Sequence, residues 1–229
     1  MDKKEIIEKT ELFVKEALSK DSTGHDWWHI HRVRNLAKRI AREQEADIFI
    51  VELSALLHDI GDYKFFQGNE KLGEKKVREW LSSLEVSPLL IDKIVEITSQ
   101  VSFMHTLPDK GGKRKDKKDS STLTISKELM AVTDADRLDA MGAIGIARAF
   151  TYGGFFNRPI YDPNIKPNKS ITKEEYKTTE APSINHFYEK LLKLKDMMYT
   201  SLGRKIAKRR HRFLNLYLKQ FFKEWKGKM

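Results

Sequence analysis

Apolar residues recur every three or four positions along most of the 229-residue chain. This spacing is typical of amphipathic helices. It predicts helices over residues 4–19 and 70–84, and another that begins at Ser87-Pro88, where the serine is an expected N-cap and the proline fits the first turn. Since no stretch alternates like a strand, the pattern predicts an all-α protein, a compact helical bundle.

The second half of the chain continues the helical pattern with one interruption. A run of apolar and small residues predicts one helix from residue 128 to Gly153-Gly154. Residues 155–183 hold four of the six prolines and predict a long surface loop. Ser183 is expected to cap a helix that reaches Met198, and Gly203 to separate it from a last helix. We expect one domain over residues 1–229, with the helices of residues 184–226 packed on the rest.

Composition narrows the class of protein. The chain has no cysteine, which excludes disulfides and thiolate metal sites and leaves His, Asp and Glu as ligands. No apolar run approaches membrane-spanning length and the first residues lack a signal-peptide core, so we expect a cytoplasmic protein without membrane contact. The net charge of +10 favours anionic partners.

The stretch Leu56-Leu57-His58-Asp59-Ile60-Gly61-Asp62 carries the clearest chemistry. It follows an apolar helical run, and Gly61 suits the end of that helix. Burying an imidazole and a carboxylate at the end of an apolar helix costs free energy unless a partner binds them. A divalent cation is one such partner, and imidazole with carboxylate suits zinc, manganese or iron.

A second candidate segment runs from His25 to Val33. His29 lies four residues before Val33 and therefore on the same buried helical face, with Arg32 beside it. Asp26 is expected to cap this helix. His25 is left open between a ligand, as the i,i+4 partner of His29, and a capping role. The two tryptophans that follow Asp26 are expected in the core or in a pocket wall.

A third segment places three carboxylates within six residues. Asp136 shares a helical face with Leu129 and Val132, so it is expected to point inward, with Asp139 beside it. Asp134 lies on a different side and is the alternative inward carboxylate. The apolar neighbours of these residues argue against a merely solvated face.

Three motifs follow one another along the chain: His29-x-x-Arg32-Val33, His58-Asp59 and Ala135-Asp136-Arg137-Leu138. Their order resembles the signature of the HD-domain superfamily of metal-dependent phosphohydrolases. The signature region covers roughly residues 20–150. The extended motifs, such as His25-Asp26-Trp27-x-His29, look like the compact bacterial branch, some of whose members act as nucleotide pyrophosphohydrolases. An extra histidine pair between His58 and Asp136 is absent, which weighs against a two-metal centre.

The resemblance implies roles for particular residues. One divalent ion, whether Mn, Mg, Fe or another metal, would be held by His29, His58, Asp59 and Asp136. Asp62 matches the position of an acidic residue beside the attacking water. Arg32 and Lys64 would lie near phosphate.

The implied function is a phosphohydrolase that splits a nucleoside triphosphate, possibly deoxy, into a monophosphate and pyrophosphate. Arg137 and the basic loop of residues 110–118 add cations that a triphosphate needs and a monoester does not. One alternative is a phosphomonoesterase for nucleoside monophosphates. Another is a nucleic-acid-binding helical protein with a structural metal, which the sequence disfavours because the ionisable cluster lies on buried faces.

Overall fold

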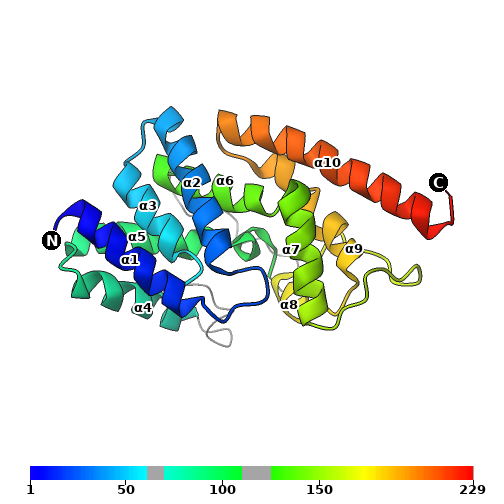
Figure 1. Ribbon diagram of the computed structural model, residues 1–229, viewed down its shortest axis with the longest axis horizontal. Coiled ribbons are helices and arrows are strands. Elements are labelled where there is room, and N and C mark those ends of the chain that lie inside the picture. The colour runs from blue at the N-terminus through cyan, green and yellow to red at the C-terminus, as the bar shows by residue number, and fades with distance from the viewer. Residues whose placement is uncertain (61–69, 110–124, 229) are drawn as a thin grey trace.

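The computed structural model describes residues 1–60, 70–109 and 125–228, and none of these residues forms a β-strand. The all-α prediction is therefore confirmed (Figure 1). The α-helices are α1 (Lys3–Ala17), α2 (Trp27–Gln44), α3 (Ile48–Leu57), α4 (Glu70–Ser83), α5 (Pro88–Gln100), α6 (Lys127–Asp139), α7 (Gly142–Phe155), α8 (Lys173–Thr178), α9 (Ser183–His186) and α10 (Ser201–Trp225). Three short helical turns are named η2 (Phe103–Thr106), η4 (Phe187–Leu191) and η5 (Leu194–Met197).

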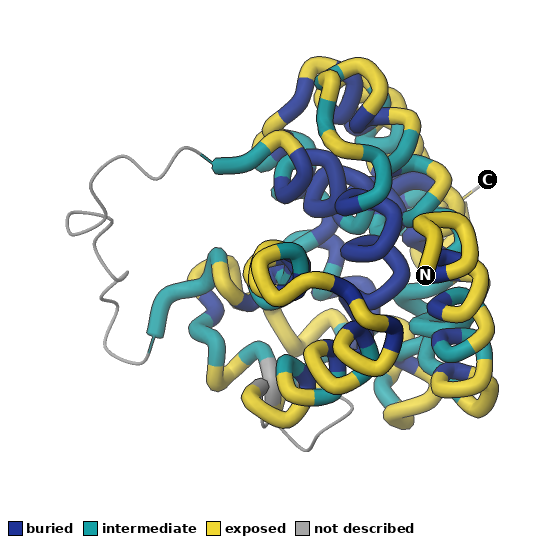
Figure 2. The backbone as a smooth tube through the Cα atoms, turned by 90° about the vertical axis from the view of Figure 1, so that its left-hand side faces the viewer, coloured by how far each residue is buried: buried dark blue, intermediate teal, exposed yellow. Residues whose placement is uncertain are grey.

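Helix α3 lies at the centre of the molecule. Its residues from Ile50 to Leu57 are all buried, and α1, α2, α5 and α6 pack around it. Figure 2 shows this buried backbone inside a shell of exposed turns. A helix that is apolar on all sides must be enclosed by other elements, so α3 brings the two residues that follow it into the interior of the protein.

Helix α2 runs alongside both α3 and α6. As expected, Asp26 caps it, because the Asp26 carboxylate accepts a hydrogen bond of 3.0 Å from the amide of His29. The cap fixes where the helix starts, and that phase places His29 on the buried face with Val33. One expectation about this segment was wrong: Trp28 has 61% of its surface exposed, since it lies on the opposite face.

The single helix predicted from residue 128 to Gly153-Gly154 is in fact two helices. Helix α6 ends at Asp139, and α7 begins at Gly142, whose φ of +71° lies in the left-handed region. A glycine adopts this conformation without a steric penalty. Periodicity alone missed the break because the apolar pattern continues on both sides of it.

The helix predicted from Ser183 to Met198 is also interrupted. It consists of the single α-turn α9, the π-helical turn η4 and the 3₁₀ turn η5. Ser183 is the first residue of α9 rather than its cap, and Pro182 precedes it without a side-chain cap. π-Helical turns are rare and often lie at functional sites. The loop expected over residues 155–183 also contains the short helix α8.

Helix α10 packs on α6 and α7, and its C-terminal end extends away from the bundle (Figure 1). It begins at Ser201, with Thr200 as its N-cap, so Gly203 lies inside it and does not precede it as predicted. A Cβ atom at Gly203 would come within 2.2 Å of the Asp134 carboxylate, so only glycine fits this approach. Among the described residues, no helix is both long and apolar enough to cross a membrane.

Candidate metal centre

Four of the predicted ligands converge beside the central helix. His29 comes from α2, His58 and Asp59 directly follow α3, and Asp136 comes from α6. The Nε2 atom of His29 lies 3.3 Å from Asp59 Oδ2 and 3.6 Å from Asp136 Oδ1. The Nε2 atom of His58 lies 3.5 Å and 3.8 Å from oxygens of the same two carboxylates. The packing of α2, α3 and α6 therefore gathers the four residues at one point.

Both imidazole rings are held by their other nitrogen. The Nδ1 atom of His29 lies 2.8 Å from the carboxylate of Asp139, and that of His58 lies 2.9 Å from the carbonyl of Ala55. With a proton on each Nδ1, both Nε2 lone pairs face the carboxylates, and the two Nε2 atoms are 3.3 Å apart. This orientation by outer carboxylate and carbonyl groups is characteristic of metal-binding histidines.

The donor atoms fit a divalent cation. Ligand atoms bound at roughly 2.0–2.2 Å to one ion lie roughly 3.0–3.5 Å from each other, close to the separations in this group. His29, His58 and Asp136 can hold an ion together, and so can the overlapping set of His25, His29 and Asp59. Two imidazoles with carboxylates suit several first-row metals.

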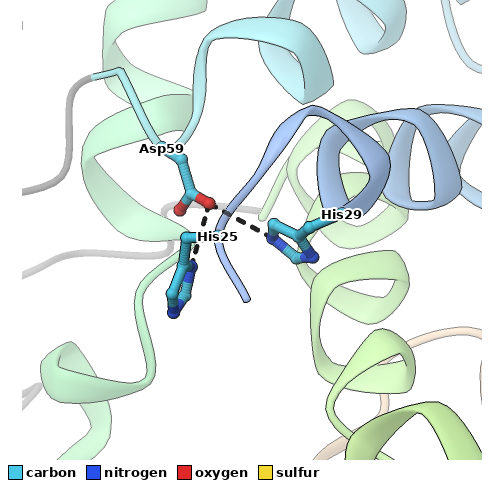
Figure 3. A group of neighbouring side chains, drawn as sticks. All are labelled: His25, His29 and Asp59. Carbon is cyan, nitrogen blue, oxygen red and sulfur yellow. Dashed lines mark hydrogen bonds and ion pairs between the residues drawn. The ribbon is translucent and has the colours of Figure 1, made fainter. Parts of the chain in front are cut away.

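His25, which the sequence left open between two roles, lies at the edge of this centre. Figure 3 shows Asp59 between His25 and His29, with its carboxylate directed at both rings. The Nδ1 atom of His25 is 3.1 Å from Asp59 Oδ2 and 3.4 Å from the Arg148 guanidinium. His25 does not cap α2, since Asp26 does. Its position allows two roles: it can orient Asp59 through a hydrogen bond, or it can act as a further metal ligand.

Asp139 links the centre to two arginines. Besides His29, its carboxylate accepts hydrogen bonds from Arg32 at 2.7 and 3.0 Å and from Arg148 at 3.1 Å. Arg148 also donates to the carbonyl of Gly24. Arg32, a predicted phosphate ligand, is therefore engaged by Asp139 in this structure. Sequence reasoning placed Asp139 beside Asp136 but gave Arg148 no role, because nothing in the pattern of α7 marks it.

Electrostatics favour ionised carboxylates at the centre. Burial by itself would raise the pKa of Asp59 and of Asp136, but the adjacent imidazoles outweigh it and lower both pKa values. Burial and then Arg148 act to lower the pKa of His29, whereas the carboxylates of Asp59 and Asp139 act to raise it, and the result is a raised pKa. The ionised carboxylates therefore favour the binding of a cation at this centre.

Two further predicted residues of α6, Arg137 and Asp134, have their hydrogen-bond partners outside the group of ligand atoms. Arg137 donates to the carbonyl of Met197, and its guanidinium lies 5.0 Å from the ring centre of Tyr199. Asp134, the alternative to Asp136, accepts hydrogen bonds from Tyr199 and Thr200 and is not part of the metal group. Asp62, Lys64 and the basic loop of residues 110–118 lie outside the described residues.

A cavity opens from the metal centre toward the C-terminal half of the chain. His58, Asp59 and Asp136 lie in its wall together with His25 and Arg148. Further wall residues come from η2, the end of α7, α8 and η4, and they include Phe103, Tyr152, Arg158, Tyr176 and Lys190. A ligand bound at the metal centre would therefore extend between these later elements.

Replacement of Asp139 by asparagine is expected to weaken binding of a divalent ion by about 10–100-fold, the usual effect of losing an outer carboxylate that orients a ligand. The reason is that His29 loses its anionic partner and Arg32 is released. Titration calorimetry with manganese on the metal-free protein measures the change. Asp92→Asn is the matched control, since Asp92 is exposed and its ion pair within the described part of the chain is with Arg78 on the surface. Unchanged affinity in Asp139→Asn would show that Asp139 does not orient His29.

Comparisons with known proteins show the family of the chain. The HD domain model matches residues 27–141. YpgQ of Bacillus subtilis is 36% identical over 220 residues, which are 96% of this chain and 94% of YpgQ.

Solved structures agree in fold as well. A Lactobacillus plantarum protein superposes with a TM-score of 0.81 at 32% identity, over 97% of each chain. An HD-superfamily hydrolase of Bacillus thuringiensis superposes with a TM-score of 0.71 at 41% identity, over 98% of this chain and 99% of that one. The crystal structure of YpgQ in complex with ADP gives a TM-score of 0.70 at 31% identity, over 95% and 97% of the two chains. The chain belongs to the HD-domain family and has the fold of its hydrolases.

Proposed function

We propose that this protein is a metal-dependent phosphohydrolase that splits nucleoside triphosphates between the α and β phosphates. The observation that carries the proposal is the convergence of His29, His58, Asp59 and Asp136 on one point in the wall of a cavity. Two imidazoles and two carboxylates leave coordination positions free on an ion that accepts five or six ligands. A water molecule and a phosphate oxygen would fill those positions.

The nucleotide part of the proposal has two supports. YpgQ, a relative that aligns over 96% of the chain, has been crystallised with ADP. The net charge of +10 also favours a strongly anionic substrate over a neutral one. The α–β position of cleavage rests on the likeness of the extended motifs around His25, His58 and Asp134 to the pyrophosphohydrolase branch of the family.

In the proposed mechanism, a bound divalent ion such as manganese, magnesium or iron supplies Lewis-acid activation of water and phosphate. His29, His58, Asp59 and Asp136 hold it. Asp62 accepts the proton of the attacking water or orients that water.

Arginine and lysine side chains offset the charge that develops on the phosphate oxygens. Arg32, Lys64 and Arg137 remain the sequence-predicted candidates for this role. Arg32 would have to share its guanidinium between phosphate and Asp139, whereas Arg137 lines the cavity and uses one nitrogen to donate to the carbonyl of Met197.

Hydrolysis in ¹⁸O-labelled water tests the proposal. A nucleoside triphosphate incubated with the manganese-loaded protein is expected to yield labelled monophosphate and intact pyrophosphate, because water attacks the α phosphorus. Chromatography with mass spectrometry of the products measures this, and the chelator-treated protein is the control. Stepwise release of orthophosphate, or turnover of monophosphates alone, would contradict the proposal and favour a phosphomonoesterase.

A further inference from the structure

Two cationic side chains line the cavity from outside the segment that matches the HD domain model. They are Arg158, in the segment that follows α7, and Lys190, in the π-helical turn η4. The model match ends at residue 141, so neither belongs to the signature. Both side chains are half-buried.

Lys190 stands over aromatic rings next to the metal centre. Its Nζ atom lies 5.1 Å from the ring centre of Phe103 and 5.9 Å from that of Tyr176. Its positive charge also acts on Asp136, whose pKa it helps to lower. The ammonium group is thus held in the cavity wall within electrostatic range of a metal ligand, without an ion pair to that ligand.

Arg158 is held in the same manner. Its guanidinium lies 5.3 Å from the ring centre of Tyr152 and 5.8 Å from that of Phe156. Its amide donates a 2.8 Å hydrogen bond to the carbonyl of Gly153, which fixes the backbone against the last turn of α7. Cation–π contacts position a charge and leave it un-neutralised.

The two arginines that contact Asp139 differ from Lys190 and Arg158 in this respect. Arg32 and Arg148 both donate to Asp139, so one carboxylate partly neutralises them. Within residues 1–60, 70–109 and 125–228, no carboxylate lies within 4.0 Å of the cationic nitrogens of Lys190 or Arg158. The carboxylate of Glu189 is buried and accepts from the amide of Asn168. Burial raises its pKa, although the Asn168 amide and the charges of Lys193 and Arg158 act in the opposite direction.

We propose that Lys190 and Arg158 bind the phosphate groups of the substrate that lie beyond the metal-bound phosphate. Two charges without an ion pair to any carboxylate of the described residues, in the wall of a cavity that reaches the candidate metal centre, fit a polyphosphate chain better than a single phosphate. The inference rests on the proposed function for its substrate. It assigns the recognition of phosphate-chain length to the C-terminal half of the protein.

The variants Lys190→Met and Arg158→Met test the assignment. Each removes a charge and keeps an apolar stem to cover the aromatic rings. Each is expected to raise KM for a nucleoside triphosphate roughly 10–100-fold, the usual effect of losing a hydrogen bond to a charged group, with a smaller change in kcat. Lys190→Arg is expected to restore much of the affinity. Lys195→Met is the matched control, because Lys195 pairs with Asp196 and does not line the cavity.

A binding experiment separates this inference from the proposed function. Calorimetry with inorganic tripolyphosphate and with orthophosphate, on the manganese-loaded protein, needs no hydrolysis. Both methionine variants are expected to lose tripolyphosphate affinity by the same roughly 10–100-fold and to keep their orthophosphate affinity. Equal loss of both ligands, equal tripolyphosphate binding in variant and wild type, or no binding by the wild type would overturn the inference. If the methionine variants lose tripolyphosphate binding as expected, but the wild type does not release pyrophosphate from a nucleoside triphosphate, only the proposed cleavage position is overturned.

Discussion

Asp59→Ala and His58→Ala are each expected to lose the bound ion and to lower kcat/KM by about 10³-fold or more, because a catalytic metal supplies several kcal/mol of transition-state stabilisation. Asp59 contacts three imidazoles, with oxygens 3.1 Å from His25, 3.3 Å from His29 and 3.5 Å from His58. Elemental analysis of the purified variants measures the metal content, and nucleotide turnover measures the rate.

Two controls make the ligand result interpretable. Asp196→Ala removes an exposed carboxylate whose ion pair, among the described residues, is with the neighbouring Lys195, and it should keep both metal and activity. Circular dichroism melting of the Asp59 and His58 variants shows whether they are folded. A folded variant that retains a full equivalent of metal would refute the assignment of that residue as a ligand.

The second large effect is expected at Asp62. Asp62→Asn should lower kcat by roughly 10²–10⁴-fold, the usual contribution of a general base, while the protein still binds its ion. Asparagine keeps the size of the side chain but cannot accept the proton of the attacking water. Steady-state kinetics give kcat, and metal analysis shows that the centre is intact.

A pH–rate comparison adds a sharper readout for Asp62. If Asp62 accepts a proton, the acidic limb of the kcat profile of the wild-type protein should report its ionisation, and Asp62→Asn should lose that limb. Equal rates in wild type and variant would leave Asp62 without a catalytic role. Loss of metal in the variant would instead make Asp62 a ligand.

The sequence predicted the fold, and it predicted which four side chains lie together, where periodicity and burial coincide. His29 and Asp136 lie on buried helix faces, as their spacing to Val33 and Leu129 predicted. His58 and Asp59 end an apolar run because α3 is buried on every side. The order of the motifs indicated metal-dependent phosphohydrolase chemistry, which periodicity alone cannot indicate.

What the sequence missed depends on contacts between distant segments. The linking role of Asp139 becomes visible only when α7 brings Arg148 to within 3.1 Å of it, since no local pattern joins two helices. The break at Gly142 and the π-helical turn η4 interrupt helices without interrupting the apolar pattern. Lys190 enters the cavity wall through that turn, and so its position could not be predicted from an α-helical period.

Helix α6 joins two distant parts of the chain within one turn. Asp136 reaches the metal centre, and Asp134 accepts hydrogen bonds of 2.9 and 2.8 Å from the amides of Tyr199 and Thr200 and one of 2.7 Å from the Thr200 hydroxyl. If the start of α10 opened locally, the buried carboxylate of Asp134 would lose these hydrogen-bond donors, which costs free energy. We therefore expect α6 and the C-terminal helix α10 to belong to one cooperative unfolding unit. Free energy gained when an ion binds to the native protein consequently protects the first turn of α10 from opening as well.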